Sequence, residues 1–177
     1  MKYLRNSSIR GVTNIPGKEH GLGVEHPIWD DLQNVLILLF FVAVSADGIS
    51  QFYLGFSTVL VNAVSFPILI LPTIFFIVVG TYLVKESHGA VLVGEGEPMF
   101  VDSGVYSRVR HPIYLGMLLT LLGFLFLEFS LIASTIWVVF FIVCDWMASY
   151  EEKDLVRILG KKYIDYQKRV PKWFPRL

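Results

Sequence analysis

Long runs of apolar residues alternate with short polar segments along this chain. Three runs cover about 29–47, 112–127 and 131–149, and a longer one covers 52–84. Two prolines within the longest run favour a short interfacial or re-entrant piece over 52–64, followed by a full span over 66–85. Because about 20 apolar residues cross a bilayer as a helix, the pattern predicts an all-α integral membrane protein with about four transmembrane helices.

The last two apolar runs are separated by only three residues, Glu128, Phe129 and Ser130. We therefore expect them to form a tight C-terminal helical hairpin. The segment after the hairpin repeats apolar residues near helical spacing and carries lysines and an arginine between them. This pattern predicts a cytoplasmic amphipathic helix that lies on the membrane, anchored by Trp173 and Phe174.

The basic residues support this count of spans. All 15 lysines and arginines lie in three segments, 1–28, 85–110 and 153–177. Four spans place these segments on one side of the membrane, so the positive-inside rule predicts that both termini are cytoplasmic. A fifth span over 52–64 would move the N-terminal segment to the other side. We therefore expect a cytoplasmic tail over 1–28 and a single membrane domain over 29–177.

Composition excludes several other classes of protein. Hydrophobic residues make up 54% of the 177 residues, and the formal net charge of zero provides no overall field that would attract nucleic acid. The single cysteine, Cys144, permits no intramolecular disulfide. The four histidines, His20, His26, His88 and His111, lack the spacing of metal ligands, so no metal site is expected.

Charged residues gather in front of the third span, in "SGVYSRVRHPIYLG" over 103–116. Pro112 suits the first turn of a helix, whose unpaired N–H groups attract an anion such as a carboxylate or a phosphate. Arg108 and Arg110 add positive charge, and Tyr114 lies one turn inside, near His111. Arginines beside a span also serve as ordinary membrane anchors, and the pattern alone fits both interpretations.

Acidic residues gather at the end of the fourth span. Asp145, Ser149 and Glu152 are spaced i, i+4, i+7 and share one face of a helix. The hairpin brings this face next to the arginine and histidine segment. An ionisable side chain within a span, such as Asp145, is a functional candidate. The two charged groups predict either an interhelical salt bridge or a pocket with one cationic and one anionic wall.

The motif over 103–116, then a hairpin, then "YEEKDLVRILGKKYIDYQKRVPKWFP" over 150–175 resembles the integral-membrane methyltransferases. This group includes isoprenylcysteine carboxyl methyltransferases and phospholipid N-methyltransferases, and the resemblance covers about half the chain. It implies that S-adenosylmethionine binds in the region 88–175, reached from the cytosol. It also implies that a lipid-like acceptor enters from the bilayer.

The resemblance also implies a set of site residues. Those that would line the cofactor are Pro98, Met99, Phe100, Val101, Tyr106, His111, Pro112, Ile113, Tyr114 and Glu151. The segment "GEGEP" over 94–98 is similar to the glycine loop of bacterial and archaeal members. It has neither the third glycine nor the βαβ context of a dinucleotide fold, so by itself it fits either a turn or a loop over a ligand.

One departure from the family pattern bears on the acceptor. The prenylcysteine enzymes have an arginine for the substrate carboxylate four residues before the glutamate equivalent to Glu151, and here that position is Met147. Asp145 and Glu152 are instead candidates for catalytic groups, and an amine could use such a carboxylate as a partner or base. This slightly favours N-methylation of an amine lipid, with Arg108, Arg110 and Met147 as substrate-binding candidates.

Two other functions remain open from the sequence. Sterol-type reductases share a similar C-terminal signature but bind NADPH. A membrane protein without catalysis would use its basic face to bind anionic lipids. Binding of S-adenosylmethionine, of NADPH or of neither distinguishes the three.

Overall fold

The computed structural model describes residues 27–55, 66–92, 100–128 and 130–174. Every element in these ranges is helical. The elements are α1 (Pro27–Leu54), α2 (Phe66–Leu92), the 3-10 turn η2 (Gly104–Ser107), α3 (Pro112–Glu128), α4 (Leu131–Leu159) and α5 (Lys161–Arg169). The prediction of an all-α protein is therefore confirmed for the described part of the chain.

Three helices are long and apolar enough to cross a membrane. They are Asp31–Leu54 in α1, Ile68–His88 in α2 and Leu131–Leu159 in α4. α3 is apolar but has only 17 residues. At ~1.5 Å per residue it is ~25 Å long, somewhat less than the ~30 Å thickness of the hydrocarbon core. The predicted count of four spans therefore stays a prediction.

The helices extend beyond the apolar runs that predicted them. α1 continues to Leu54, α2 to Leu92 and α4 to Leu159, whereas the predicted spans end at 47, 85 and 149. Hydropathy marks where a chain leaves lipid, but the hydrogen bonds of a helix continue into water. Residues 52–54 of the predicted interfacial piece belong to α1, and 56–65 lie outside the described residues, as do 1–26 of the tail.

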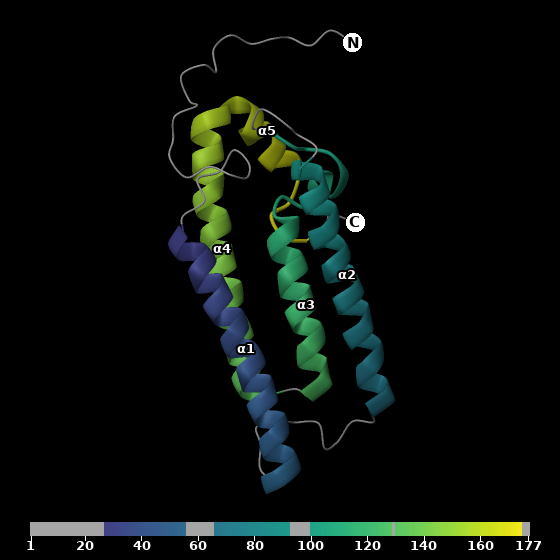
Figure 1. The fold of residues 1–177 in the computed structure, drawn as a ribbon. Coiled ribbons are helices and arrows are strands. Elements are labelled where there is room, and N and C mark those ends of the chain that lie inside the picture. The colour runs from purple at the N-terminus through teal and green to yellow at the C-terminus, as the bar shows by residue number, and fades with distance from the viewer. Residues whose placement is uncertain (1–26, 56–65, 93–99, 129, 175–177) are drawn as a thin grey trace.

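The four long helices form two pairs, α1 with α4 and α2 with α3 (Figure 1). Glycines bring α2 and α3 close together. A Cβ atom added to Gly80 would lie 2.6 Å from the carbonyl oxygen of Gly116, so no larger residue fits there. In the α1–α4 pair the contact is made by large side chains, among them the buried Phe40 and Phe140. Close contact between small residues is typical of helices packed in membranes.

The predicted hairpin is formed by α3 and α4. Ser130 caps the start of α4 by accepting a hydrogen bond from the Ala133 amide, and its own hydroxyl donates to Asp47 of α1 at 2.5 Å. At the other end of the bundle, Gly160 with φ 54° permits the turn from α4 into α5. Figure 1 shows α5 at the end where α3 begins and α4 ends, together with the start of α1 and the end of α2.

Candidate functional site where α3 begins and α4 ends

The site is built on His111, which directly precedes α3, and on two consecutive glutamates of α4. Nε2 of His111 lies 2.9 Å from Glu152 Oε1, and Nδ1 lies 3.5 Å from Glu151 Oε2. Burial alone would lower the pKa of the His111 imidazole, but the hydrogen bonds and charges of the two glutamates outweigh it and raise the pKa above 6.5. The arrangement therefore favours a protonated imidazole between two carboxylates.

The two glutamates differ in how much of each side chain is accessible. Glu152 is 12% exposed and also accepts a 3.0 Å hydrogen bond from Gln167. Glu151 is 29% exposed, and its carboxylate accepts a short hydrogen bond from the Tyr114 hydroxyl, one turn into α3. His111 and Tyr114 stack with ring centroids 5.8 Å apart. Glu151 is thus held in a fixed orientation while its side chain stays partly exposed.

Arg110 connects α3 to the C-terminal segment. Its Nε lies 2.9 Å from Glu152 Oε1, an ion pair in which the N–H is not aligned for a hydrogen bond. Its Nη1 donates to the carbonyl oxygens of Gln167 at 3.0 Å and Val170 at 3.2 Å. The sequence predicted that Arg110 binds substrate, together with Arg108. The structure uses the Arg110 guanidinium within the protein, whereas Arg108 is exposed.

Asp145 lies beside this network and is bound by the end of the chain. Lys172 Nζ lies 2.5 Å from Asp145 Oδ1 and 2.8 Å from Ser149 Oγ, and the Trp173 indole N–H donates to the same Oδ1 at 2.8 Å. Asp145, Ser149 and Glu152 therefore face one partner segment, 167–173, as their spacing indicated. The Asp145 side chain is 46% exposed, and the bonds described here all use Oδ1.

Met147 points elsewhere. It is buried, and its sulfur accepts a hydrogen bond of 3.2 Å from Gln33 of α1. The position at which the prenylcysteine enzymes carry an arginine thus faces α1 in this chain, away from Lys172 and Asp145.

The other predicted cofactor residues that the structure describes lie at the same end of the bundle. Phe100 packs against Tyr163 and Tyr166 of α5, with ring centroids 5.8 and 5.2 Å away. Tyr106 is held by a 2.6 Å hydrogen bond from Tyr166 to its carbonyl oxygen. The remaining members are Val101 and Ile113, partly buried, Pro112, fully buried, and Pro98 and Met99, which lie outside the described residues.

The Tyr106 hydroxyl belongs to the electrostatic surroundings of the site. Burial raises its pKa to about 12, an interaction with Ser87 of α2 lowers it in part, and the charge of Glu151 raises it further. The hydroxyl therefore stays neutral and can donate a hydrogen bond at any physiological pH.

Sequence reasoning missed three residues of this arrangement, Gln167, Lys172 and Trp173. Trp173 was predicted as a membrane anchor, but its ring lies 6.1 Å from His111 and 5.6 Å from Phe141, between centroids. One signal was available. An acid within a span, such as Asp145, needs a basic partner, and Lys172 is the basic residue directly before Trp173.

These features together define a helical membrane protein with a partly open, charged site at one end of a helix hairpin. A family model described as phospholipid methyltransferase matches residues 51–162, which is more than half of the chain. The chain therefore belongs to the phospholipid methyltransferase family and is an integral membrane protein, as its motifs predicted. Comparison with curated proteins gives no match.

Proposed function

We propose that the protein transfers a methyl group from S-adenosylmethionine to the amine of a phospholipid at the cytoplasmic surface of the membrane. Membership of the phospholipid methyltransferase family supports the reaction and the class of acceptor. It also makes methyl transfer better supported than the reductase or non-catalytic alternatives. Both termini are proposed to be cytoplasmic, because the start of α1 and the end of α4 lie at the same end as α5 (Figure 1) and the basic segments of the sequence favour the cytoplasmic side for that end.

The observation that carries the proposal is the state of Glu151. S-adenosylmethionine has an ammonium group and ribose hydroxyls, all of which donate hydrogen bonds to a carboxylate. Glu151 is partly exposed and is fixed by Tyr114 and His111, so it fits such donors without losing its internal contacts. When bound, S-adenosylmethionine supplies an electrophilic methyl group on its sulfonium.

Glu152 is proposed to act as a positioning residue rather than a catalytic one. Its carboxylate is engaged by His111, Arg110 and Gln167 and is largely buried. It therefore fixes the imidazole that in turn orients Glu151. Holding the reacting groups in line is the main task in methyl transfer, and such alignment lowers barriers by ~7–11 kcal/mol.

Asp145 is proposed to receive the amine of the acceptor. The amine arrives protonated and must lose that proton before its lone pair can attack carbon. The ion pair with Lys172 on Oδ1 favours the ionised carboxylate, and Oδ2 is proposed to attract the ammonium and accept its proton. Position 147, at which the prenylcysteine enzymes carry an arginine for the substrate carboxylate, is here a methionine that faces α1. At this position α4 therefore offers no cation to a carboxylate substrate.

The proposal is tested by incubating the purified protein with S-adenosylmethionine labelled in its methyl group and a lipid extract of the host, then identifying the labelled lipid. We expect label on the nitrogen of an amine phospholipid. Calorimetry in detergent should show binding of S-adenosylmethionine and its demethylated product. Tight binding of NADPH with neither of these would assign the chain to the reductase group instead.

The role of Asp145 has its own test. Asp145→Asn should lower turnover by about 10²-fold or more, typical of a lost general base, with cofactor affinity nearly unchanged. Activity of the wild type should rise with pH as more acceptor amine is deprotonated. Full turnover by Asp145→Asn would show that the amine loses its proton to another group.

A further inference from the structure

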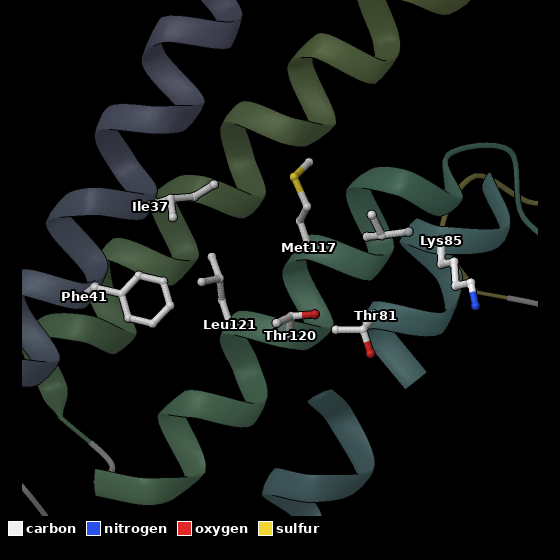
Figure 2. Close-up of a pocket in the computed structure, with 8 residues that line it drawn as sticks. Ile37, Phe41, Thr81, Lys85, Met117, Thr120 and Leu121 are labelled. Atoms are coloured by element: carbon white, nitrogen blue, oxygen red, sulfur yellow. The ribbon is translucent and has the colours of Figure 1, made fainter. Parts of the chain in front are cut away.

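A cavity of about 370 Å³ lies between α1, α2 and α3, outside the charged site. Figure 2 shows Ile37 and Phe41 extending from α1 towards Leu121 of α3, with Thr81 on the α2 side. α3 forms its floor, and α1 and α2 form its walls. Its volume falls within the ~300–1,000 Å³ that is typical of ligand sites.

The lining is apolar even where threonines contribute to it. The Thr81 hydroxyl donates to the Ile77 carbonyl at 2.7 Å, and the Thr120 hydroxyl donates to the Gly116 carbonyl at 2.9 Å. Both hydroxyls are thus satisfied by their own helices, which leaves mainly hydrocarbon to line the space. Such a cavity suits an alkyl chain and not a polar ligand.

One cation stands at the edge of this apolar space. The stem of Lys85 borders the cavity, and its ammonium extends beyond the lining in Figure 2. Lys85 is exposed, and none of the ion pairs formed among residues 27–55, 66–92, 100–128 and 130–174 includes it. A lysine whose stem lies on hydrocarbon while its charge extends out of the apolar lining suits pairing with a lipid phosphate.

The cavity lies close to the charged site along α3. Met117, which lines the cavity, follows Tyr114 by three residues on the same helix, so the two side chains lie on the same face about one turn apart. Tyr114 holds Glu151. The apolar cavity and the charged site are therefore neighbours along α3.

We propose that this cavity binds one acyl chain of the phospholipid acceptor and that Lys85 pairs with its phosphate. This inference rests on the proposed function and specifies how the acceptor is recognised. The apolar lining holds the chain, Lys85 sets the depth of the headgroup, and the amine beyond the phosphate extends towards Asp145 and Glu151. Recognition of the phosphate distinguishes a phospholipid from an amine that has only an alkyl chain.

The first test compares two acceptors, a phosphatidylethanolamine and a long-chain primary amine with no phosphate. Lys85→Gln should raise KM for the phospholipid about tenfold, as expected for loss of one charged contact, and leave KM for the simple amine unchanged. Affinity for S-adenosylmethionine should not change. Lys161→Gln, at an exposed lysine of α5, is the matched control and should leave both KM values unchanged. An equal effect of Lys85→Gln on both acceptors, or none on either, overturns the role of Lys85.

The second test locates the chain without any reaction. The protein is reconstituted with a phosphatidylethanolamine that carries a photoactivatable group in its acyl chain, in the absence of S-adenosylmethionine. Cross-links should fall on cavity residues such as Met117. They should decrease several-fold in Ile37→Trp, which fills the cavity, and not in Leu38→Trp, which adds the same side chain to the exposed face of α1.

The two tests separate the two proposals. Cross-links in the cavity without methyl transfer to any lipid would support the acyl-chain site and contradict the proposed function. Methyl transfer with cross-links spread over the outer helix faces, equally in both tryptophan variants, would support the function and overturn the cavity as the acceptor site. If Ile37→Trp does not fold, the wild-type cross-links and Lys85→Gln still decide the outcome.

Discussion

The two ends of the helix bundle both hold an acidic side chain bound by neighbouring helices, but they differ in how accessible that acid is. Asp47 is 7% exposed and is bonded to Ser130, which is 1% exposed. Glu151 is also bonded, to Tyr114, yet its side chain stays 29% exposed. A closed pair joins helices, whereas a fixed carboxylate that is partly open can still bind a ligand. This difference supports the proposal that the ligand binds at the end at which α3 begins.

The largest effect is expected at the buried ion pair that closes the site. Arg110→Gln should destabilise the protein by about 3–5 kcal/mol, because it leaves Glu152 with less charge compensation and frees two carbonyl groups of the C-terminal segment. Thermal unfolding in detergent, followed by circular dichroism, measures this loss. Activity should fall with it, since segment 167–173 would no longer be held against α3.

Arg108→Gln is the control for this variant, because Arg108 is exposed and only two residues away. It should change the unfolding free energy by no more than about 0.5 kcal/mol. If both variants lose the same stability, the network around Arg110 has no special structural role.

A smaller but more specific effect is expected at Glu151. Glu151→Gln should weaken binding of S-adenosylmethionine by about 1.5–3 kcal/mol, roughly tenfold or more, because it removes a charged acceptor. Glu152→Gln should weaken binding less and stability more, since its carboxylate is bonded mainly within the protein. Calorimetry of both variants shows which of them loses more affinity for S-adenosylmethionine. Equal losses of affinity would mean that the two glutamates share the cofactor.

The sequence predicted contacts between residues close together along the chain better than contacts between distant segments. The hairpin is local, because only three residues separate its helices, so the meeting of His111 with Glu151 and Glu152 followed from connectivity alone. The shared face of Asp145 and Glu152 followed from helical spacing in the same way.

The features that the sequence did not reveal depend on how separate segments pack in three dimensions. Trp173 is typical of a membrane anchor, but the chain after α5 turns it back onto Phe141 and His111. No local pattern specifies that turn. Met147 was a substrate candidate because of its offset from Glu151, yet the rotation of α4 against α1 brings it to Gln33. Helix length was underestimated because α1, α2 and α4 continue past the apolar runs.

The Asp47–Ser130 pair, at the end of the bundle opposite Glu151, provides a control for the Glu151 prediction. Asp47→Ala should cost about 1–3 kcal/mol of stability, because it removes the acceptor of the Ser130 hydroxyl at a buried position. It should leave affinity for S-adenosylmethionine unchanged, since Asp47 and Glu151 lie at opposite ends of the bundle and distant sites act independently. A loss of affinity as large as that of Glu151→Gln would show that the ends are coupled through the helices.

The smallest effect is the pH dependence that His111 adds to stability. Its pKa is raised above 6.5 in the folded protein because Glu151 and Glu152 outweigh the opposing effect of burial. A raised pKa means that the folded state holds the proton more tightly than the unfolded state. The stabilisation is therefore fully present below pH 6.5 and is lost as pH rises through the raised pKa of the folded protein. A hydrogen bond to a charged group contributes about 1.5–3 kcal/mol, and burial of the imidazole offsets part of this contribution.

The comparison of wild type with His111→Gln isolates this contribution, because glutamine can donate a hydrogen bond to Glu152 but does not titrate. Apparent melting temperatures are measured in detergent from pH 6 to pH 9. The wild type should exceed the variant most at pH 6, and the difference should shrink steadily towards pH 9. Asp47→Ala, measured in parallel, should have a lower melting temperature than the wild type, and this difference should not shrink steadily as the pH rises. A wild-type advantage that grows with pH would mean that burial outweighs the glutamates and that the imidazole is neutral in the folded protein.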